Sequence, residues 1–504
     1  MHYQNPVIPG FNPDPSLCRV GEDFYLVTSS FEFFPGVPIY HSRNLVNWQL
    51  IGHCLADETQ LPLKKCRASG GIWAPTLRCH QGRFYMTTTN SMDGGNFYVT
   101  AESIHGPWSA PVWVEMEGID PTIFFDEDGS SWYLTNGGID GESGLILASI
   151  DLVTGKLLTA PRLICRGSGG RALEAPHLYK IKDTYYLLAA EGGTEEGHMV
   201  TIFRSKQIEG PYEGCPRNPI LSHRDRLWDP IQATGHADLV EDQNGNWWAV
   251  CLAIQTIGGM HLHNLGREAF LAPVSWGDGW PVIGNEGTVS YEMDGPLPSP
   301  ANPACHDFFD AFQSPVFHKE WNWVRNLDKS SYSIKDGALT LKHHQIPLSA
   351  PTGSPCFMGI RQTGFISTFE ATVMPGEHSF GGLTAYLCDT NHYDVFVRRN
   401  GDRLTVGLRK CLLDIETITC ELEQEADGPV WLRIVTGPQR YDFFASIDGV
   451  TWMPLGSGMT AGLCTEVTPR MTFTGVYLGL WCDQGGMQFR SVKKQDSPRS
   501  PLLP

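Results

Sequence analysis

The chain lacks the segments that would carry it into or across a membrane. No run of about 18 apolar residues occurs, and a membrane-spanning helix needs roughly that many. The first residues, MHYQNPVIPGFNPDPS, contain neither a basic stretch nor the apolar core of about 7–15 residues that standard signal peptides have. We therefore expect a cytoplasmic protein with no membrane partner.

Positive charge is scarce in this sequence. It holds 37 Lys and Arg against 55 Asp and Glu, which gives a formal net charge of −18. Nucleic-acid phosphates require a basic surface, so this balance argues against a nucleic-acid partner. The 14 cysteines include no Cys-x-x-Cys pair, and in a chain without a signal peptide we expect reduced, mostly buried thiols.

Helical periodicity is almost absent, which excludes a TIM barrel because that fold needs a helix after each strand. Gly (54), Pro (35) and aromatic residues (11%, with 15 Trp) are abundant instead. Frequent turns and flat apolar rings indicate an all-β architecture with a surface suited to carbohydrate, since sugars stack their C–H faces on such rings. With 504 residues, 41% apolar and 18% charged, the chain is globular and long enough for two or three domains.

Five segments in the first part of the chain share one pattern, an aromatic or bulky pair followed by further β-forming residues. Their starts are 60, 48, 53 and 62 residues apart, and each follows a turn-like stretch. A turn before a run of β-formers is a hairpin signal. The segments are Phe24–Val27, Phe84–Thr87, Trp132–Thr135, Tyr185–Leu188 and Trp247–Val250.

A second recurring unit lies roughly ten residues before each of these pairs, and a period near 50 residues with several short strands is typical of a β-propeller blade. Five units predict a five-bladed β-propeller; a solenoid fits such long, irregular units less well. The first strand of each blade lines the central channel, so the recurring units should face one another around the axis. They are Asp14-Pro15-Ser16, Trp73-Ala74-Pro75, Asp120-Pro121-Thr122, Glu174-Ala175-Pro176 and His236-Ala237-Asp238.

The repeat stops where the chain becomes rich in proline. We predict a propeller over residues 1–292, a linker over 293–304 and a second domain over 305–504. Alternating apolar runs such as Phe369–Val373 and Tyr393–Val397 predict that this second domain is an antiparallel β-sandwich. The polar tail after Val492 should be ordered only if it docks.

The three channel carboxylates, Asp14, Asp120 and Glu174, suit the hydrolysis of a glycosidic bond. One protonated carboxyl gives a proton to the leaving oxygen, and a second carboxylate activates water or attacks the sugar. A third nearby carboxylate raises the pKa of the acid by repulsion between like charges. A single Asp before Pro is usually a turn residue, but three acids buried together are costly and indicate chemistry or a bound cation.

The remaining polar candidates each have two interpretations. His236 is either a hydrogen-bonded core histidine or a ligand to a hard cation, or to its waters, in the channel. Trp73 either stacks on a sugar or packs in the core, and Arg267 either contacts a sugar or a carboxylate or makes a structural salt bridge. Glu191 and Asp238 could support the site, whereas the pair Glu195-Glu196 is expected in a solvated loop.

With these residues in place, the sequence resembles glycoside hydrolase family 43. The resemblance spans the expected propeller and continues into the sandwich, as in the two-domain β-xylosidases and α-L-arabinofuranosidases of that family. The motifs that carry it are Asn5–Val7, Gly10–Ser16, Phe34–Val37, His41–Trp48, Ser69–Pro75, Gly118–Pro121, Glu174–Lys180 and Ala233–Asp238.

The resemblance implies an inverting mechanism in which Asp14 is the general base and Glu174 the general acid. Asp120 would raise the pKa of Glu174 and orient it. The family pattern also implies that Phe31 and Trp73 shape the sugar pocket, that Arg267 contacts the sugar, and that Tyr477 of the sandwich completes the rim. His236 would lie near a structural calcium ion in the channel, with no cofactor required, and relatives often form dimers or tetramers.

The sequence departs from the family pattern beside the acid. Ala175 stands where relatives commonly have Gly, and Arg171-Ala172-Leu173 replaces a stretch that carries Trp-Pro in relatives. Both changes bear on the fine specificity of the site.

These observations lead to one main hypothesis and three alternatives. The main one is an inverting exo-glycosidase that removes terminal β-D-xylose from small oligosaccharides, and α-L-arabinofuranose as well. The alternatives are an enzyme that acts mainly on α-L-arabinofuranose, a retaining fructosidase-type propeller, and a non-catalytic carbohydrate-binding propeller.

Overall fold

The computed structural model describes residues 1–258, 261–302, 305–326, 328–425 and 428–497. The all-β prediction is confirmed: the described helices are three short 3₁₀ turns, η1 (Lys329–Ser331), η2 (Thr460–Leu463) and η3 (Thr465–Val467). Within the described residues, no helix has the length and apolar character that crossing a membrane requires.

The N-terminal part contains five antiparallel sheets of four or five strands, each built from strands that follow one another in the chain, except that the first sheet skips β4. The first two sheets are β2 (Ser16–Val20), β3 (Asp23–Val27), β5 (Gly36–Ser42), β6 (Gln49–Leu55), and β7 (Thr76–His80), β8 (Arg83–Asn90), β9 (Gly95–Ala101), β10 (Val112–Trp113). The third is β11 (Thr122–Phe125), β12 (Ser131–Ile139), β13 (Glu142–Asp151), β14 (Lys156–Leu157), β15 (Arg162–Cys165). The last two are β16 (Glu174–Ile181), β17 (Thr184–Glu191), β18 (Met199–Ser205), β19 (Glu213–Gly214), β20 (Leu221–Ser222), and β21 (Ile231–Glu241), β22 (Trp247–Gln255), β23 (Glu268–Gly277), β24 (Trp280–Ile283).

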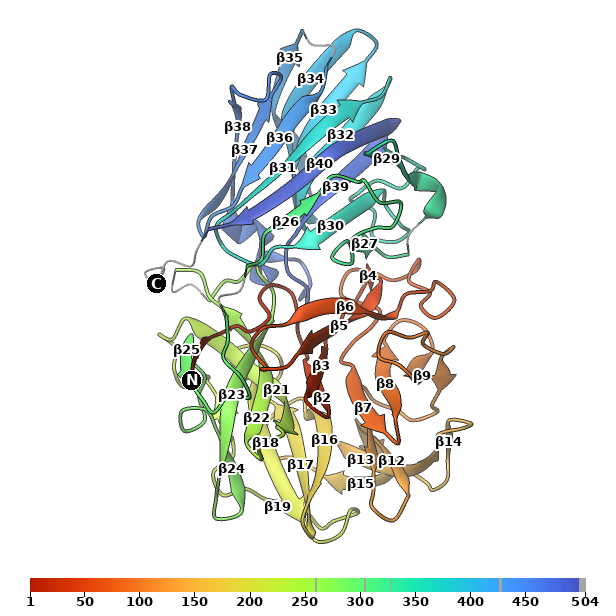
Figure 1. Ribbon diagram of the computed structural model, residues 1–504, viewed down its shortest axis with the longest axis vertical. Helices are drawn as coiled ribbons and strands as arrows, with labels where there is room; N and C mark the ends of the chain where they lie inside the picture. The colour runs from red at the N-terminus through yellow and green to blue at the C-terminus, as the bar shows by residue number, and fades with distance from the viewer. Residues whose placement is uncertain (259–260, 303–304, 327, 426–427, 498–504) are drawn as a thin grey trace.

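The sheets form a closed ring, because the first strand of each sheet contacts the first strand of the next, and β21 contacts β2. Figure 1 shows this ring below the C-terminal sheets. The second strands β17 and β22 are buried along nearly their whole length, since their sheets are covered on both faces by neighbouring sheets. The N-terminal strand β1 (His2–Gln4) pairs with β25 (Glu292–Asp294) and fastens the two ends of the ring together.

Two further sheets face each other in the C-terminal part and form the sandwich. One contains β26 (Phe308–Asp310), β28 (Tyr332–Lys335), β29 (Ala338–Lys342), β31 (Ser367–Pro375), β36 (Val430–Val435), β37 (Arg440–Ser446), β38 (Met453–Met459) and β40 (Gly486–Asp496). The other contains β30 (Phe357–Arg361), β32 (Ser379–Cys388), β33 (Asn391–Asn400), β34 (Arg403–Leu412), β35 (Ile415–Gln424) and β39 (Tyr477–Gln484). Burial alternates along β31 and β36, as expected for a sheet with one face toward a core.

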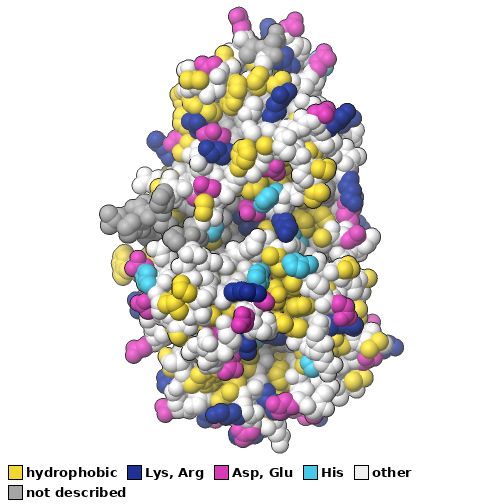
Figure 2. Space-filling view, viewed as in Figure 1, with side chains coloured by type: hydrophobic (Ala, Val, Ile, Leu, Met, Phe, Trp, Pro, Cys, Tyr) yellow, Lys and Arg dark blue, Asp and Glu magenta, His cyan; other side chains and the backbone are white. Residues whose placement is uncertain are grey.

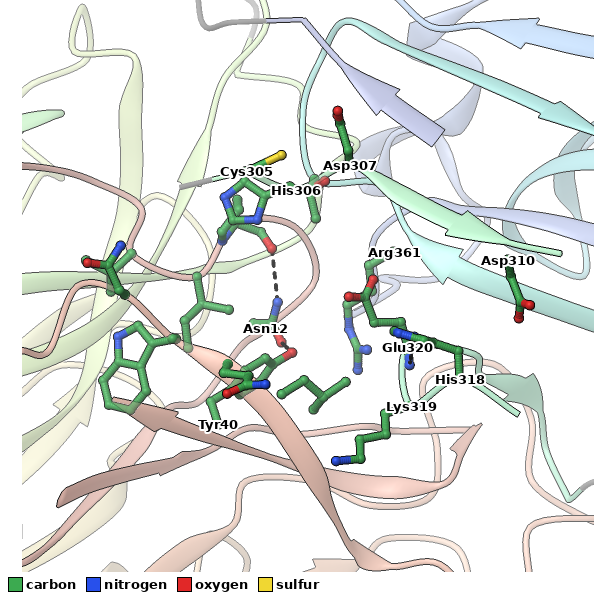
Figure 3. Close-up of a pocket in the computed structure, with 18 of the residues that line it drawn as sticks. Asn12, Tyr40, Cys305, His306, Asp307, Asp310, His318, Lys319, Glu320 and Arg361 are labelled. Atoms are coloured by element: carbon green, nitrogen blue, oxygen red, sulfur yellow. Dashed lines mark hydrogen bonds between the residues drawn. The ribbon is translucent and has the colours of Figure 1, made fainter. Parts of the chain in front are cut away.

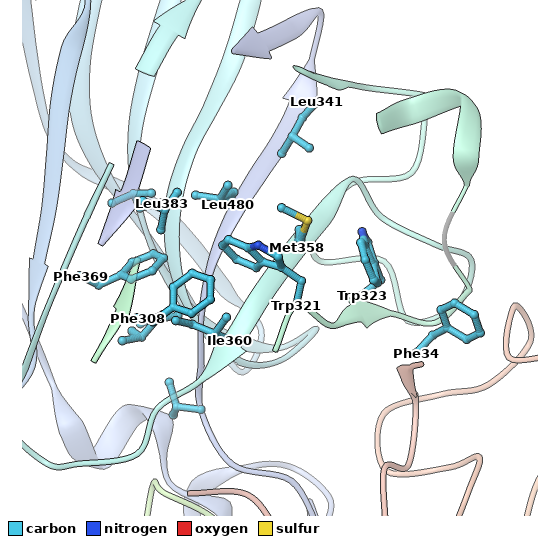
Figure 4. Packing of buried hydrophobic residues seen from close by; sticks show 14 of the residues in the cluster. Phe34, Phe308, Trp321, Trp323, Leu341, Met358, Ile360, Phe369, Leu383 and Leu480 are labelled. Atoms are coloured by element: carbon cyan, nitrogen blue, oxygen red, sulfur yellow. The ribbon is translucent and has the colours of Figure 1, made fainter. Parts of the chain in front are cut away.

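The hydrophobic core of the sandwich continues into the ring. Figure 4 shows Phe369 of one sheet facing Leu383 and Leu480 of the other, with Trp323 turned toward Phe34 of the ring. Phe34 belongs to β4 (Phe33–Phe34), which pairs with β27 (Trp323–Val324) and so joins the two parts by backbone hydrogen bonds. Sandwich and ring are therefore in direct contact, through the β4–β27 pairing and a shared hydrophobic core.

The structure changes two expectations at the ends of the sandwich. The expected linker at 293–304 starts inside β25, so its first residues belong to the ring; residues 303–304 lie outside the described part. The tail after Val492 continues β40 to Asp496, because Lys494 is buried and donates to Asp496 there. Residues 498–504 of that tail lie outside the described part.

A cavity of about 830 Å³ lies between the ring and the sandwich. Figure 3 shows Asn12 and Tyr40 of the ring on one side and Arg361, Lys319 and Glu320 of the sandwich on the other. None of the three candidate carboxylates lines it.

On the face of the molecule seen in Figure 2, Lys and Arg side chains are interspersed with Asp and Glu. Among the described residues of this face, Lys and Arg form no extended patch.

Candidate active site

A small pocket of about 260 Å³ lies at the end of the ring where its inner strands begin. It brings together seven of the eight predicted site residues; the exception is Tyr477. Its volume falls slightly below the roughly 300–1,000 Å³ of pockets that hold drug-sized ligands, so it suits a ligand of about one sugar ring. The pocket is lined by Asp14, Phe31, Trp73, Ala74, Ile119, Asp120, Arg171, Ala172, Glu174, Gly193, Thr194, Glu195, His198, His236, Arg267, Met471 and Phe473.

The backbone aims the carboxylates by leaving regular strand geometry. Asp14 and Asp120 stand two residues before β2 and β11 with φ of 55° and 54°, a region that non-glycine residues rarely adopt. Glu174 is the first residue of β16, and a β-bulge follows it, with Ala175 at φ 52°. Glu174 therefore stands one residue before the left-handed position that Asp14 and Asp120 occupy. Such strained residues cluster at functional sites.

Asp14 is surrounded by hydrogen-bond donors and positive charge. Arg267 donates from Nη1 to Asp14 Oδ1 at 3.0 Å, and Ser29 donates from Oγ to Oδ2 at 2.5 Å. His236 Nδ1 lies 3.6 Å from Asp14 Oδ1. Burial alone would raise the pKa of Asp14, but Arg267, His236 and Ser29 outweigh it and hold the pKa below its ordinary value. The Asp14 carboxylate is thus ionised at neutral pH.

Glu174 and Asp120 have the opposite electrostatics. Burial, and then the negative charge of Asp14, raises the pKa of Glu174 to about 7. Burial and repulsion from Glu174 and Asp14 raise the pKa of Asp120 well above its ordinary value, although Asp120 accepts the N–H of Ala175. Both carboxyls therefore keep their protons to a higher pH than an ordinary Asp or Glu, in the same pocket as the ionised Asp14.

Three aromatic rings form one wall of the pocket, and one of them comes from the sandwich. Phe473 stacks on Phe31 with ring centroids 5.6 Å apart and meets Trp73 edge-on at 6.1 Å. The Arg267 guanidinium lies 5.7 Å from the Phe31 ring and 5.5 Å from the Phe473 ring. Trp73 and Phe473 remain partly exposed in the pocket, as a surface that stacks on sugar must be.

The prediction that Tyr477 completes the rim is wrong; Phe473 takes that place. Tyr477 is the first residue of β39 and is fully buried. Its ring stacks on Phe33 at 4.0 Å and lies edge-on to Phe11, beneath the pocket wall. Phe473 and Tyr477 are the two ends of the short motif Phe473–Tyr477. Phe473 precedes β39 and faces the pocket, whereas Tyr477 begins β39 and is buried.

Ser69 holds this wall together. Its Oγ accepts the backbone N–H of Phe473 at 2.8 Å, and its carbonyl accepts Trp73 Nε1 at 3.2 Å. Its own N–H donates to the buried Glu32 at 2.9 Å. Arg267 also donates to the Phe473 carbonyl, at 3.4 Å, so both polar groups of the Phe473 backbone are bonded to the ring.

Sequence reasoning missed several pocket residues. Glu195 lies in the pocket wall and pairs with Arg171, whereas a solvated loop was expected there. Thr194 accepts from Arg267 Nη1 at 2.9 Å, and His198 donates from Nδ1 to the Ala233 carbonyl at 3.0 Å. Short polar loops have no hydrophobic periodicity, so these contacts could not be predicted from the sequence. The stretch Arg171–Leu173, which departs from the family pattern, was the one sequence signal in this region.

Glu191 supports the loop that leads to the acid. This fully buried carboxylate accepts the N–H groups of Ser168 and Gly170, each at 2.8 Å, and the Thr201 hydroxyl at 2.8 Å. Asp238, the other expected supporting residue, lies outside the pocket wall, where Arg78 donates to it at 2.9 Å and Ser16 at 2.7 Å. Glu191 therefore fixes the approach to Glu174, and Asp238 fixes the strands around the axis.

The residues around His236 do not fit a metal ion held by side chains. In the part of the chain that the structure describes, no group of three or more His, Cys, Asp or Glu is arranged to hold a metal. The two nearest carboxylates are engaged: Asp14 by Arg267 and Asp238 by Arg78.

The geometry provides the two groups that hydrolysis of an acetal needs. An ionised carboxylate can take a proton from water, and a protonated carboxyl can give one to a leaving oxygen. The aromatic wall and Arg267 can hold a sugar ring between them.

Two family models match consecutive parts of the chain. Residues 3–281 match the model described as glycosyl hydrolases family 43, and residues 309–491 match the β-xylosidase C-terminal concanavalin A-like domain. A non-reducing-end α-L-arabinofuranosidase of Bacteroides ovatus is 43% identical over 96% of this chain and 92% of that protein. A xylan 1,3-β-xylosidase of a Vibrio species is 34% identical over 95% of both chains, and a β-xylosidase of Bacillus subtilis is 32% identical over 96% of both.

Solved structures of this family superpose on the whole chain. A Bacteroides ovatus GH43B protein superposes with a TM-score of 0.92 at 40% identity, covering 99% of this chain and 100% of that one. A xylan β-1,4-xylosidase of Bacillus halodurans superposes with a TM-score of 0.90 at 30% identity, covering 98% and 100%. The ring of sheets and the C-terminal sheets are thus the β-propeller and β-sandwich of these structures, and the chain belongs to glycosyl hydrolase family 43 and is a glycoside hydrolase.

Proposed function

We propose that this glycoside hydrolase is an inverting exo-enzyme that removes terminal β-D-xylose, and also α-L-arabinofuranose, from small oligosaccharides. The observation that carries the proposal is that Asp14 and Glu174 share one small pocket in which their pKa values are shifted in opposite directions. Each of the five sheets then acts as one blade of a five-bladed propeller, and the blade starts supply the reacting groups.

The proposed reaction is a single displacement. Glu174 donates its proton to the glycosidic oxygen as the bond to the anomeric carbon breaks. Asp14 takes a proton from a water molecule as the water oxygen attacks the anomeric carbon from the opposite face, which inverts the configuration. Asp120 keeps the proton on the pair before reaction and orients Glu174 through the Ala175 N–H. Arg267 and the aromatic wall hold the terminal sugar.

The choice of sugar rests on the relatives. Similar proteins are named for terminal arabinofuranose and for xylose, so both sugars are candidates. The α-L-arabinofuranosidase of Bacteroides ovatus supports an enzyme that acts mainly on arabinofuranose as the second candidate.

An NMR time course on an aryl β-D-xyloside and an aryl α-L-arabinofuranoside tests the proposal. We expect the first-formed sugar to have inverted configuration before it mutarotates. A first product with retained configuration would assign a double displacement instead, in which the two carboxyl groups stand about 5–5.5 Å apart. Binding of both sugars without turnover would make the protein a carbohydrate-binding propeller.

We also propose a cytoplasmic protein that forms dimers or tetramers. The support for the location is that the 14 cysteines are free, most of them buried, which suits a reducing compartment. Light scattering coupled to gel filtration tests the assembly. A calcium ion near His236 stays a prediction, and such an ion would be held largely through water.

A further inference from the structure

One tryptophan stands almost free in solvent on the pocket side of the propeller. Trp228 is 95% exposed, and its neighbour Leu227 is 55% exposed. Both lie in residues 223–230, which connect β20 to β21, the strand that carries His236. These two neighbouring side chains give an otherwise polar loop an exposed apolar surface.

The loop that carries Trp228 is firmly held. The buried side chain of Gln232 donates from Nε2 to the carbonyls of Arg226 and Asp229, at 2.8 Å each. Thr256 of the neighbouring loop donates its backbone N–H to the Pro230 carbonyl at 2.8 Å. The exposure of Trp228 is therefore a property of an ordered turn, which presents the ring without a further loss of backbone entropy on binding.

The contacts of this loop place it on the side of Glu174. Before Trp228, Arg224 donates to Met199 Sδ at 3.0 Å, and Met199 pairs with Glu191, the residue that fixes the loop before the acid. After Arg224, the Leu227 carbonyl bonds to His261 at 3.0 Å, and His261 bonds to Glu196.

Glu196 directly follows Glu195, which lies in the pocket wall and pairs with Arg171. Two separate chains of contact thus lead from the loop 223–230, at Arg224 and at Leu227, to the elements that flank Glu174.

We propose that Trp228 is a stacking platform for the sugar units on the leaving-group side of the bond that is cleaved. This inference rests on the proposed function, because the general acid marks the side on which the leaving chain emerges. The pocket holds the terminal sugar, so the rest of an oligosaccharide must leave past the wall residues Arg171 and Glu195. The loop 223–230 is joined to this wall through His261 and Glu196. An exposed indole there offers a flat apolar face to the C–H face of a sugar ring, and Arg171 and Glu195 offer hydrogen bonds to its hydroxyls.

The test compares substrates that do and do not reach the platform. Trp228→Ala and Trp228→Phe are assayed on an aryl pentoside and on a series of two to four sugar units ending in the pentose that the protein cleaves. We expect Trp228→Ala to lower kcat/KM on the longest substrate roughly tenfold, mainly through KM, because an aromatic face is lost. The aryl pentoside should be hydrolysed at the unchanged rate, and Trp228→Phe should restore most of the loss. Phe309→Ala, an exposed ring on the sandwich, is the matched control and should change nothing.

A binding measurement separates this proposal from the proposed function. Calorimetry of xylotetraose with Glu174→Gln, and with Glu174→Gln combined with Trp228→Ala, reports the platform without any turnover. Weaker binding by the double variant supports the stacking role of Trp228. This result holds even if hydrolysis proves to retain the anomeric configuration.

Equal binding by both proteins, or an equal loss on all substrates, overturns the proposal. So does a drop in molecular mass of Trp228→Ala in light scattering with unchanged kinetics, which would assign Trp228 to contact with a second copy of the chain.

Discussion

The propeller pocket and the sandwich each bury carboxyl groups, but they surround them differently. In the sandwich, Asp394 accepts from His392 Nδ1 at 2.9 Å and from Arg409 Nε at 2.7 Å, and Arg409 also bonds to Asp483 at 3.0 Å. Burial would raise the pKa of Asp394, but His392 and Arg409 lower it to about 2. The charge is matched there and has no proton to exchange near neutral pH.

In the pocket, Glu174 and Asp120 meet mainly other negative charge. Asp14 takes the contact with Arg267, and burial together with neighbouring negative charge raises the pKa values of the remaining two carboxyls. The two regions thus use buried carboxyl groups differently. A carboxylate paired with cations joins neighbouring strands, whereas two carboxyls that repel each other have raised pKa values suited to proton transfer.

Removing the acid should have the largest effect. For Glu174→Gln we expect a loss of about 10²–10⁴ in kcat on oligosaccharides, because the amide cannot protonate the leaving oxygen. The loss should shrink on an aryl pentoside with a good leaving group. Thermal unfolding should occur at the same or a higher temperature, since the substitution removes a buried repulsion. Full activity on oligosaccharides would show that Glu174 is not the acid.

Disrupting the buried cluster of Asp394, His392 and Arg409 should have the opposite result, a loss of stability without a loss of activity. Asp394→Asn leaves the buried Arg409 and His392 without their common anion, and we expect a loss of about 3–5 kcal/mol in the free energy of unfolding in urea. Activity per folded molecule should stay unchanged because the cluster does not line the pocket. A large loss of activity in folded protein would contradict the comparison.

The pH dependence should report the pocket alone. Because burial and Asp14 raise the pKa of Glu174 to about 7, kcat/KM should fall about tenfold per pH unit above that value as the acid loses its proton. The raised pKa also means that the folded state binds the proton more tightly than the unfolded chain, so stability from this group falls as the pH rises from 4.5 to about 7. Burial raises the pKa of Glu32 to about 7 as well. Glu32→Gln is therefore the control, and its kcat/KM should show the same fall at high pH as the unmodified protein.

The sequence predicted the all-β class and brought Asp14, Asp120 and Glu174 to one place, because repeat register needs only spacing. It misjudged Tyr477 and missed Phe473, since the two rings are four residues apart and the first residue of β39 decides their direction. It also missed Ser29 and Thr194, whose roles arise from contacts between distant loops.

The aromatic wall gives a smaller test of the same comparison. Phe473→Ala should raise KM about tenfold, because one face of the sugar-binding wall is lost. Tyr477→Phe should leave KM and kcat within twofold, since it keeps the ring that packs on Phe33. A larger rise in KM for Tyr477→Phe than for Phe473→Ala would show that Tyr477, and not Phe473, contacts the sugar.

Metal removal should have the smallest effect. Arg78 and Arg267 already neutralise the carboxylates near His236, so prolonged chelation should change activity and the unfolding temperature little. Loss of activity that calcium alone restores would place an ion in the channel.

The anchoring of Phe473 has a consequence for how such a chain can diverge. A sandwich on a flexible tether could be exchanged for another without touching catalysis. Here Ser69 of the propeller accepts the backbone N–H of Phe473, and Arg267 donates to its carbonyl. A hybrid with a sandwich from a relative would therefore have to form both of these hydrogen bonds again before its pocket wall was complete.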